Sequence, residues 1–262
     1  MELIYLLLLL FGLIMGSFIS MWSFRAPRNL SLGGRSFCDV CRKKIKWYRN
    51  IPLISYLMLH GRCPDCKNKI SVRYPLIESF TALSFFLTGY LMLEKGRIPE
   101  ILSTLGLFTL PAALALLTLF IVHIAVDLEE QILPDTVTLI LGVTALVLAS
   151  LLPSSLLLER VFAGFLVFAG FLLVHLITRG RGMGFGDVKL VFVLGVLLGL
   201  YQSLTFLNLA FIGGAVTGLV LIAVRKAKFG KEIPFGPFLL VSAWVSLFFS
   251  SELTSWYLGL FR

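Results

Sequence analysis

Long apolar stretches recur along the whole chain and constrain its fold more than any other feature. A helix of about 20 apolar residues crosses the roughly 30 Å hydrocarbon core of a bilayer. Eight stretches qualify, although one is short and is either tilted or continuous with its neighbour, so seven is the competing count. The stretches are residues 3–23, 74–93, 102–124, 136–152, 161–178, 188–202 (the short one), 204–224 and 235–255. We therefore expect an all-α, polytopic membrane protein of about eight transmembrane helices.

The composition excludes the soluble alternatives. Hydrophobic residues make up 58% of the chain and charged residues only 14%, whereas soluble domains carry about 25% charged residues. The mean hydropathy of +0.95 is too high for a chain that must cover its surface with polar groups. Residues 3–23 lack a basic segment before them and an A-x-A-like site after them, so we expect a retained first helix rather than a signal peptide.

The basic residues predict the orientation. The polar segment 24–73 holds 12 of the 23 Lys and Arg residues, and the loops expected on the same face hold most of the rest. Cytoplasmic loops of membrane proteins carry this excess, so we expect segment 24–73 in the cytoplasm and the N-terminus outside. The net charge of +9 then reflects topology and anionic lipid, and we expect no nucleic-acid partner.

Four cysteines form two CxxC pairs within this polar segment. The pairs Cys38–Cys41 and Cys63–Cys66 are separated by 21 residues, a little more than the usual spacing of zinc ribbons. Two disulfides or four unrelated thiols are the alternatives, and the reducing cytoplasm disfavours the disulfides. We expect a structural Zn²⁺ in a small zinc-ribbon-like cytoplasmic insertion, with His60 as a less suitable substitute ligand.

Two aspartates are expected at the same face of the bilayer. Asp127 ends a long apolar run, and Asp187 lies in GMGFGDVKL at the start of another. Ionisable residues next to the membrane are functional hypotheses by default, and two neighbouring carboxylates that share a proton activate water in aspartic proteases. The structural alternatives are a helix cap for Asp187 and a solvated helix end for Asp127.

Several nearby residues have more than one interpretation. Gly184 and Gly186 either allow close backbone approach to a substrate or adopt a positive φ. Asp135 is expected to be a helix N-cap. Lys189 is expected to snorkel toward lipid phosphate, and the alternative is that it lowers the pKa of a nearby Asp. His123 fits a hydrogen-bonded core position better than a proton relay.

Seven segments resemble one known family in their order along the chain, the bacterial type IV prepilin peptidases. Four lie in the N-terminal part: GSFISMWSFRAP at 16–27, the paired CxxC motifs, KWYRNIPLISYLMLHGRCPDC at 46–66 and SVRYPLIE at 71–78. Three lie in the C-terminal part: DLEEQILPD at 127–135, GMGFGDVKL at 182–190 and IPFGPFL at 233–239.

The resemblance implies an inner-membrane aspartic endopeptidase of the GxGD type. Such enzymes remove the basic leader of prepilins and pseudopilins at the cytoplasmic boundary, after a glycine. Bifunctional members also methylate the new N-terminus with S-adenosylmethionine. Carried onto this sequence, the catalytic residues are Asp127 and Asp187, Gly184 and Gly186 complete the GxGD element, and the family's zinc ligands are Cys38, Cys41, Cys63 and Cys66. No glycine-rich adenosyl-binding signature is visible, so no methyltransferase residue is named.

The resemblance also suggests a purpose for an acidic loop. Residues 125–135 carry four acids and no Lys or Arg, and we expect Glu129 and Glu130 to attract the basic leader toward Asp127. The expected division is a first helix at 1–23, a zinc-binding, methyltransferase-associated domain at 24–73 and a peptidase domain at 74–262. The rival functions are an ion- or proton-coupled transporter and a non-catalytic secretion-system assembly factor. The oligomeric state stays open.

Overall fold

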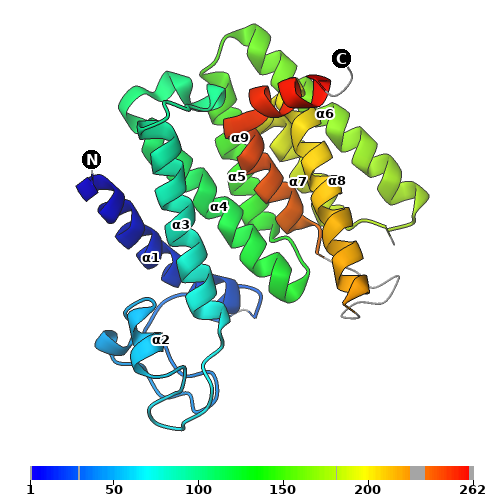
Figure 1. Ribbon diagram of the computed structural model, residues 1–262. Helices are drawn as coiled ribbons and strands as arrows, with labels where there is room; N and C mark the ends of the chain where they lie inside the picture. Colours follow the sequence, from blue (N-terminus) through cyan, green and yellow to red (C-terminus); the bar gives the residue numbers. More distant parts are fainter. Residues whose placement is uncertain (1, 29, 181, 225–233, 260–262) are drawn as a thin grey trace. The chain divides into compact units, whose positions relative to one another are not determined.

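The computed structural model describes residues 2–28, 30–180, 182–224 and 234–259, and the chain divides into two units, Met1–Gly96 and Arg97–Arg262. All regular elements of the described residues are helices, and the described residues also contain two isolated β-bridges but no strand. The α-helices are α1 (Glu2–Arg25), α2 (Ile54–Met58), α3 (Arg73–Leu93), α4 (Thr109–Glu130), α5 (Asp135–Ser150), α6 (Ser154–Ile177), α7 (Phe185–Leu198), α8 (Leu200–Ala223) and α9 (Gly236–Gly259), and two 3₁₀ segments cover Trp47–Arg49 and Glu100–Phe108 (Figure 1).

The all-α prediction is confirmed, and each of the eight apolar stretches is helical. Within the described residues, six helical spans are long and apolar enough to cross a membrane, one of them formed by the 3₁₀ segment together with α4. The helices α5 and α7 are shorter, with 16 and 14 residues. The predicted boundary between 188–202 and 204–224 is wrong. The break lies at Gly199, whose φ of +78° ends α7 and lets α8 begin at Leu200.

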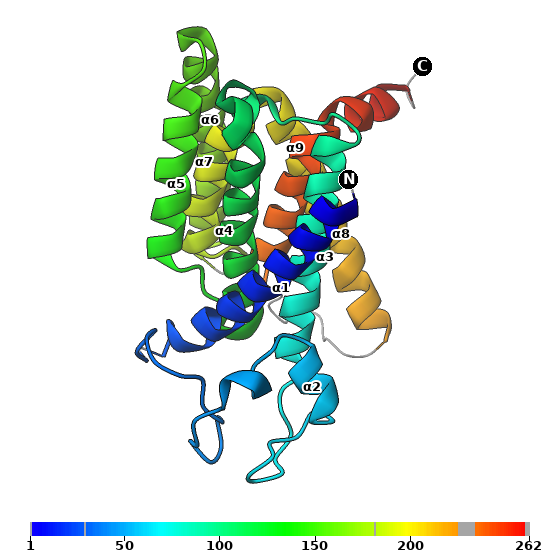
Figure 2. The same cartoon turned by 90° about the vertical axis from the view of Figure 1, so that its left-hand side faces the viewer.

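In the N-terminal unit, α1 crosses α3 at very short range (Figure 2). A Cβ atom built on Gly12 would lie 2.6 Å from the Cα of Ala82, and one on Gly16 would lie 2.7 Å from the Cα of Glu78. Two glycines four residues apart let the helix backbones touch, as is common in membrane helix pairs.

The chain after α1 is held by the guanidinium of Arg25, which is only 4% exposed. It donates hydrogen bonds to the carbonyl oxygens of Ser31, Gly33 and Arg35 at 3.1 to 3.2 Å. These bonds satisfy backbone acceptors that no helix or strand pairs. The segment between α1 and α3 is therefore fixed at its start without regular secondary structure.

In the C-terminal unit, α7 is the central helix and contacts α5, α6, α8 and α9 (Figures 1 and 2). Its residues Val188, Leu190, Val191 and Leu194 are fully buried, as expected for a helix that is apolar all round. A Cβ on Gly195 would lie 2.7 Å from the Cα of Gly164, so α6 and α7 also pack through glycines. The outer helices expose large apolar side chains, which suits a lipid environment.

The end of the C-terminal unit opposite Asp187 on α7 is stabilised by a buried charge. Arg160 is 1% exposed, pairs with Glu100 at 2.7 Å and donates to the carbonyl of Leu197 at 2.7 Å. This arrangement ties α6 to the 3₁₀ segment and to the last turn of α7. Next to it, the carboxylate of Glu159 accepts the backbone N–H of Leu200, the first residue of α8, so the start of α8 is capped from α6.

Candidate active site and metal centre

Asp127 lies in the last full turn of α4, not beyond the helix. The helix continues to Glu130 and ends at Gln131, whose left-handed backbone lets its N–H bond to the carbonyl of Asp127 at 3.0 Å. The side chain of Asp127 is 5% exposed, and its Oδ2 has no hydrogen-bond partner among the described residues. The solvated helix-end interpretation is therefore wrong. An unsatisfied buried carboxylate oxygen is unusual and calls for an explanation such as catalysis or a bound water.

Asp187 lies in the first turn of α7, close enough for the charge of Asp127 to act on its carboxyl group. It is the third residue of the helix, and the backbone amide of the N-cap residue Gly184 interacts with its carboxyl group. This is the position from which an acidic side chain serves the N-terminus of a helix. Asp187 thus has the structural role considered above, and its carboxyl group also lies within electrostatic range of Asp127.

Backbone from a third helix closes the space beside Asp127. A Cβ on Gly236, the first residue of α9, would lie 2.5 Å from Oδ2 of Asp127 and 3.2 Å from Leu133. A Cβ on Gly186 would lie 3.2 Å from the same leucine. Leu133 therefore separates the glycines of α7 and α9, and the site is built from α4, the α4–α5 connection, α7 and α9.

Gly184 and Gly186 act through close packing and not through unusual backbone angles. Gly184 has a φ of −68°, and Gly186 is also outside the left-handed region. Of the two alternatives for these glycines, the positive-φ one is wrong. Their value to the site is the absence of a side chain near Leu133 and near the carboxyl group of Asp187.

An ion pair flanks the aspartates. Asp135 is the first residue of α5, after the N-cap residue Pro134, so its predicted N-cap position is wrong by one residue. Its carboxylate pairs with Lys189, two residues after Asp187. The expected snorkelling of Lys189 is therefore replaced by a bridge between α5 and α7.

Two further predicted groups have clear positions. His123 is fully buried, with Nδ1 2.9 Å from the carbonyl of Leu119 and Nε2 3.0 Å from the hydroxyl of Thr138. Both ring nitrogens are thus occupied, as expected for a core histidine. Glu129 and Glu130 follow Asp127 in the last turn of α4, where Glu129 is exposed and Glu130 half-buried.

The four cysteines come together as one cluster. The sulfur atoms of Cys38, Cys41, Cys63 and Cys66 lie within 4.8 Å of one another, with 3.8 Å between Cys38 and Cys66. Thiolates around zinc at about 2.3 Å form a tetrahedron with edges of roughly 3.8 Å. All four are free thiols, which rules out the disulfide alternative for this structure. The cluster has the geometry to bind a metal ion, and His60 is not part of it.

Each CxxC pair folds into the same turn. The bridges Phe37–Lys44 and Arg62–Lys69 close the two turns. The residues directly after the second cysteine of each pair, Arg42 and Lys67, both have a positive φ, of 58° and 60°. In the second turn, the backbone N–H of Cys66 lowers the pKa of the Cys63 thiol to about 7. Stabilising the thiolate in this way prepares it for a metal.

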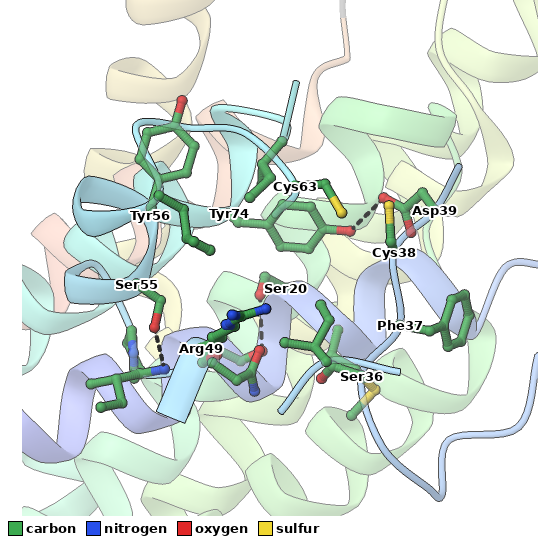
Figure 3. Close-up of a pocket in the computed structure, with 18 of the residues that line it drawn as sticks. Ser20, Ser36, Phe37, Cys38, Asp39, Arg49, Ser55, Tyr56, Cys63 and Tyr74 are labelled. Carbon is green, nitrogen blue, oxygen red and sulfur yellow. Dashed lines mark hydrogen bonds between the residues drawn. The ribbon is translucent and has the colours of Figure 1, made fainter. Parts of the chain in front are cut away.

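A cavity of about 1020 Å³ adjoins the cysteine cluster within the N-terminal unit. It is lined by the end of α1, the connection through α2 and the start of α3, and Cys38 and Cys63 are part of its wall. Figure 3 shows Tyr74 with its hydroxyl toward Asp39, next to these two cysteines, and the hydroxyl donates to Asp39 at 3.1 Å. Sites for small ligands have about this volume or less.

Sequence reasoning missed three components of these sites. Leu133 and Gly236 lie in segments quoted for the resemblance, but only the tertiary structure brings them to Asp127. Glu78 lines the cavity and is 7% exposed. It is an acid in an apolar helix, and that alone is a signal that could have marked it.

Fold and sites together define the class of protein. It is a helical membrane protein with an aspartate pair at one end of its C-terminal unit, and with a four-cysteine site beside a ligand-sized cavity in its N-terminal unit.

Comparison with known proteins specifies this class. Residues 10–92 match the bacterial peptidase A24 N-terminal domain, and residues 114–219 match the type IV leader peptidase family. The chain belongs to this family of prepilin leader peptidases.

Several curated relatives carry the name prepilin leader peptidase/N-methyltransferase. The Aeromonas salmonicida protein is 36% identical over 86% of this chain and 75% of the relative. The Pseudomonas aeruginosa protein is 33% identical over 95% of this chain and 92% of the relative. The Vibrio cholerae protein is 31% identical over 97% of this chain and 100% of the relative. No solved structure matches significantly.

Proposed function

We propose that this chain is an inner-membrane aspartic endopeptidase that removes the leader of prepilins and pseudopilins and then N-methylates the new N-terminus. Membership of the family and the names of the relatives support both activities. Within this proposal, Asp127 and Asp187 are the catalytic residues, and Gly184 and Gly186 leave room for the substrate backbone. The aspartates, the acidic loop and segment 24–73 face the cytoplasm, in keeping with the distribution of Lys and Arg.

The unpartnered Oδ2 of Asp127 carries the proposal. Two carboxylates that feel each other's charge share one proton more cheaply than both ionise. The ionised partner takes a proton from water while the protonated partner donates to the scissile carbonyl. The water attacks directly, without a covalent acyl-enzyme. Among the described residues this oxygen makes no hydrogen bond, although the backbone N–H of Gly236 acts on the same carboxyl group, so Oδ2 is available for that water.

The position of the pair favours a peptidase over a transporter. Coupled transporters bind ions near the bilayer midplane, often at broken helices. Here Asp127 is in the last full turn of α4, and Asp187 is in the first turn of α7. Acids at helix ends suit a substrate whose leader lies outside the hydrocarbon core.

The N-terminal unit supplies the other components of the proposal. The cysteine cluster holds a structural Zn²⁺, because its sulfur spacing fits tetrahedral thiolate coordination. The adjoining cavity takes the methyl donor S-adenosylmethionine, and its residues fit such a group. Tyr56 and Tyr74 offer aromatic rings for a nucleobase or a sulfonium, and Arg49 offers a guanidinium for a carboxylate.

Mass spectrometry of a synthetic prepilin treated with the purified protein in detergent tests the function. We expect loss of the leader without the methyl donor, and loss of the leader plus one added methyl group with it. A prepilin whose glycine before the cut is replaced by a bulky residue should stay intact. Binding of prepilin without any cleavage would favour the assembly-factor alternative and reject the proposal.

A further inference from the structure

The carboxylate of Glu78 is a buried acid that the peptidase chemistry does not use. Glu78 lies in the second turn of α3, is 7% exposed and lines the cavity of the N-terminal unit. An acidic side chain in a membrane-spanning helix is costly and is kept where it pairs with a partner or serves a function.

Glu78 differs from the other two carboxylates of the cavity wall, Asp39 and Asp65, because Glu78 is buried and they are exposed. Among the described lining residues, Asp39 accepts the hydroxyl of Tyr74 and Asp65 pairs with Lys43 at 3.3 Å. Glu78 accepts the backbone N–H of Leu53 at 2.8 Å and interacts with the hydroxyl of Ser17. Both donors are neutral, and no ion pair to Glu78 occurs in the described part of the chain.

This leaves Glu78 able to bind a cation. A carboxylate has about four acceptor positions, and the two neutral donors occupy only part of them. Basic side chains, such as Lys44, Lys46, Arg49 and Lys69, outnumber the acids Asp39 and Asp65 in the rest of the wall. A positively charged group that enters the cavity is therefore directed to Glu78.

The position of Glu78 is fixed from two sides. The backbone of α1 touches α3 here, since a Cβ on Gly16 would lie 2.7 Å from the Cα of Glu78. The N–H of Leu53, just before α2, holds the carboxylate from the other side. A site that must bring two reactants together needs this rigidity.

We propose that Glu78 binds the α-ammonium group of the cleaved substrate in this cavity and takes its proton for methyl transfer. The proposal rests on the N-methyltransferase part of the proposed function. The ammonium first loses a proton to the Glu78 carboxylate, because only the neutral amine has a lone pair. The amine nitrogen then forms a bond to the methyl carbon as the carbon–sulfur bond breaks. The electron pair stays on sulfur, which becomes a neutral thioether, and Glu78 passes its proton to solvent.

Binding of a pre-cleaved peptide separates this role from a structural one. The peptide begins at the new N-terminus, carries either a free or an acetylated α-amine, and is titrated without methyl donor into the wild type, Glu78→Gln and Glu78→Asp. We expect the wild type to bind the peptide with the free amine about tenfold more tightly than the acetylated peptide, as for a charge-assisted hydrogen bond. The preference should disappear in Glu78→Gln and return in part in Glu78→Asp. Equal affinities of both peptides for the wild type would overturn the proposal.

Methyl transfer to the same free-amine peptide gives the second readout. We expect Glu78→Gln to lower the rate about a hundredfold, as for loss of a general base, with little change in prepilin cleavage. An unchanged zinc content of Glu78→Gln, measured by elemental analysis, shows that the N-terminal unit of the variant is folded. Glu94→Gln, which changes an exposed acid at the end of the same helix, should methylate normally. Normal methylation by Glu78→Gln would contradict the assignment even if cleavage by Asp127 and Asp187 holds.

A third measurement locates the methyl donor independently of activity. Radiolabelled S-adenosylmethionine is crosslinked to the wild type by ultraviolet light, and the label is mapped by peptide sequencing. Label within residues 36–78 supports the cavity as the methyl-transfer site. Label confined to the unit Arg97–Arg262 would reject both the cavity and the role of Glu78, while the peptidase proposal would stand.

Discussion

The carboxylate of Asp127 is positioned by backbone as much as by other side chains. The backbone of α9 approaches it at Gly236, where even a Cβ atom would come within 2.5 Å of Oδ2. The acids themselves could be predicted from the sequence, because charged residues next to apolar runs are conspicuous. Gly236 and Leu133 could not, because their role depends on which helices meet, and a local pattern does not record that.

We therefore expect Gly236→Ala to damage cleavage without unfolding the protein. The added methyl group must push the carboxylate of Asp127 away from its position, and misplacement of a catalytic group by about 1 Å costs on the order of a hundredfold in rate. Initial rates of prepilin cleavage measure this. Gly213→Ala is the matched control on the neighbouring helix α8, because its Cβ would make only an ordinary 3.6 Å contact with Phe238. Equal cleavage rates for Gly236→Ala and Gly213→Ala would contradict the claim that the backbone of Gly236 positions the Asp127 carboxylate.

The acidic loop gives a second prediction at the residue scale. Replacing Glu129 and Glu130 together with Gln should raise KM for prepilin more than it lowers kcat, because attraction of the basic leader acts on binding. The effect should shrink as salt is added, since exposed charges are screened over about 10 Å at 0.1 M. Steady-state kinetics at two ionic strengths provide the measurement. An unchanged KM at low salt would reject charge steering.

At the scale of whole elements, glycine contacts decide which helices pack together. The apolar stretches could be predicted because about 20 residues are needed to cross a bilayer. The end of α7 was misplaced because the break depends on the positive φ of a single residue, Gly199, inside a continuous apolar run. The CxxC turns were predictable, since two cysteines at that spacing already define half of a metal site.

The pair α1 and α3 should be sensitive to bulk at Gly12. A leucine there would overlap the backbone of Ala82, 2.6 Å from the new Cβ, and overpacking typically costs about 1–3 kcal/mol. We expect Gly12→Leu to lower the thermal unfolding temperature in detergent. Gly170→Leu, with nothing within 4 Å on α6, should not. An unchanged unfolding temperature for Gly12→Leu would show that the two helices do not pack at this distance.

Removal of metal should unfold the segment between α1 and α3. That segment is too small for a core of its own, and bound zinc supplies folding free energy. We expect one zinc per chain by elemental analysis, and at least tenfold faster proteolysis within 24–73 after chelation or in Cys63→Ser. His60→Ala should keep its zinc, because His60 is outside the cluster. Resistance to protease after complete zinc loss would contradict a structural role.

For the molecule as a whole, the two units carry different chemistry. The aspartate pair lies entirely in the unit Arg97–Arg262, and the cysteine cluster and the cavity lie in Met1–Gly96. The division into a first helix at 1–23, a zinc-binding domain at 24–73 and a peptidase domain at 74–262 stays a prediction. In the structure, α3 packs along α1 within the N-terminal unit, a contact that the sequence spacing did not indicate.

The central claim is that Asp127 and Asp187 act together in cleavage, and one measurement tests it most directly. Initial rates of prepilin cleavage are compared for the wild type, Asp127→Asn, Asp187→Asn and the double variant, at equal amounts of folded protein. We expect the cleavage rate of each single variant to fall about a thousandfold or more. The double variant should be no slower than either single variant, because the two residues act as a unit. Full turnover by the double variant would contradict the account.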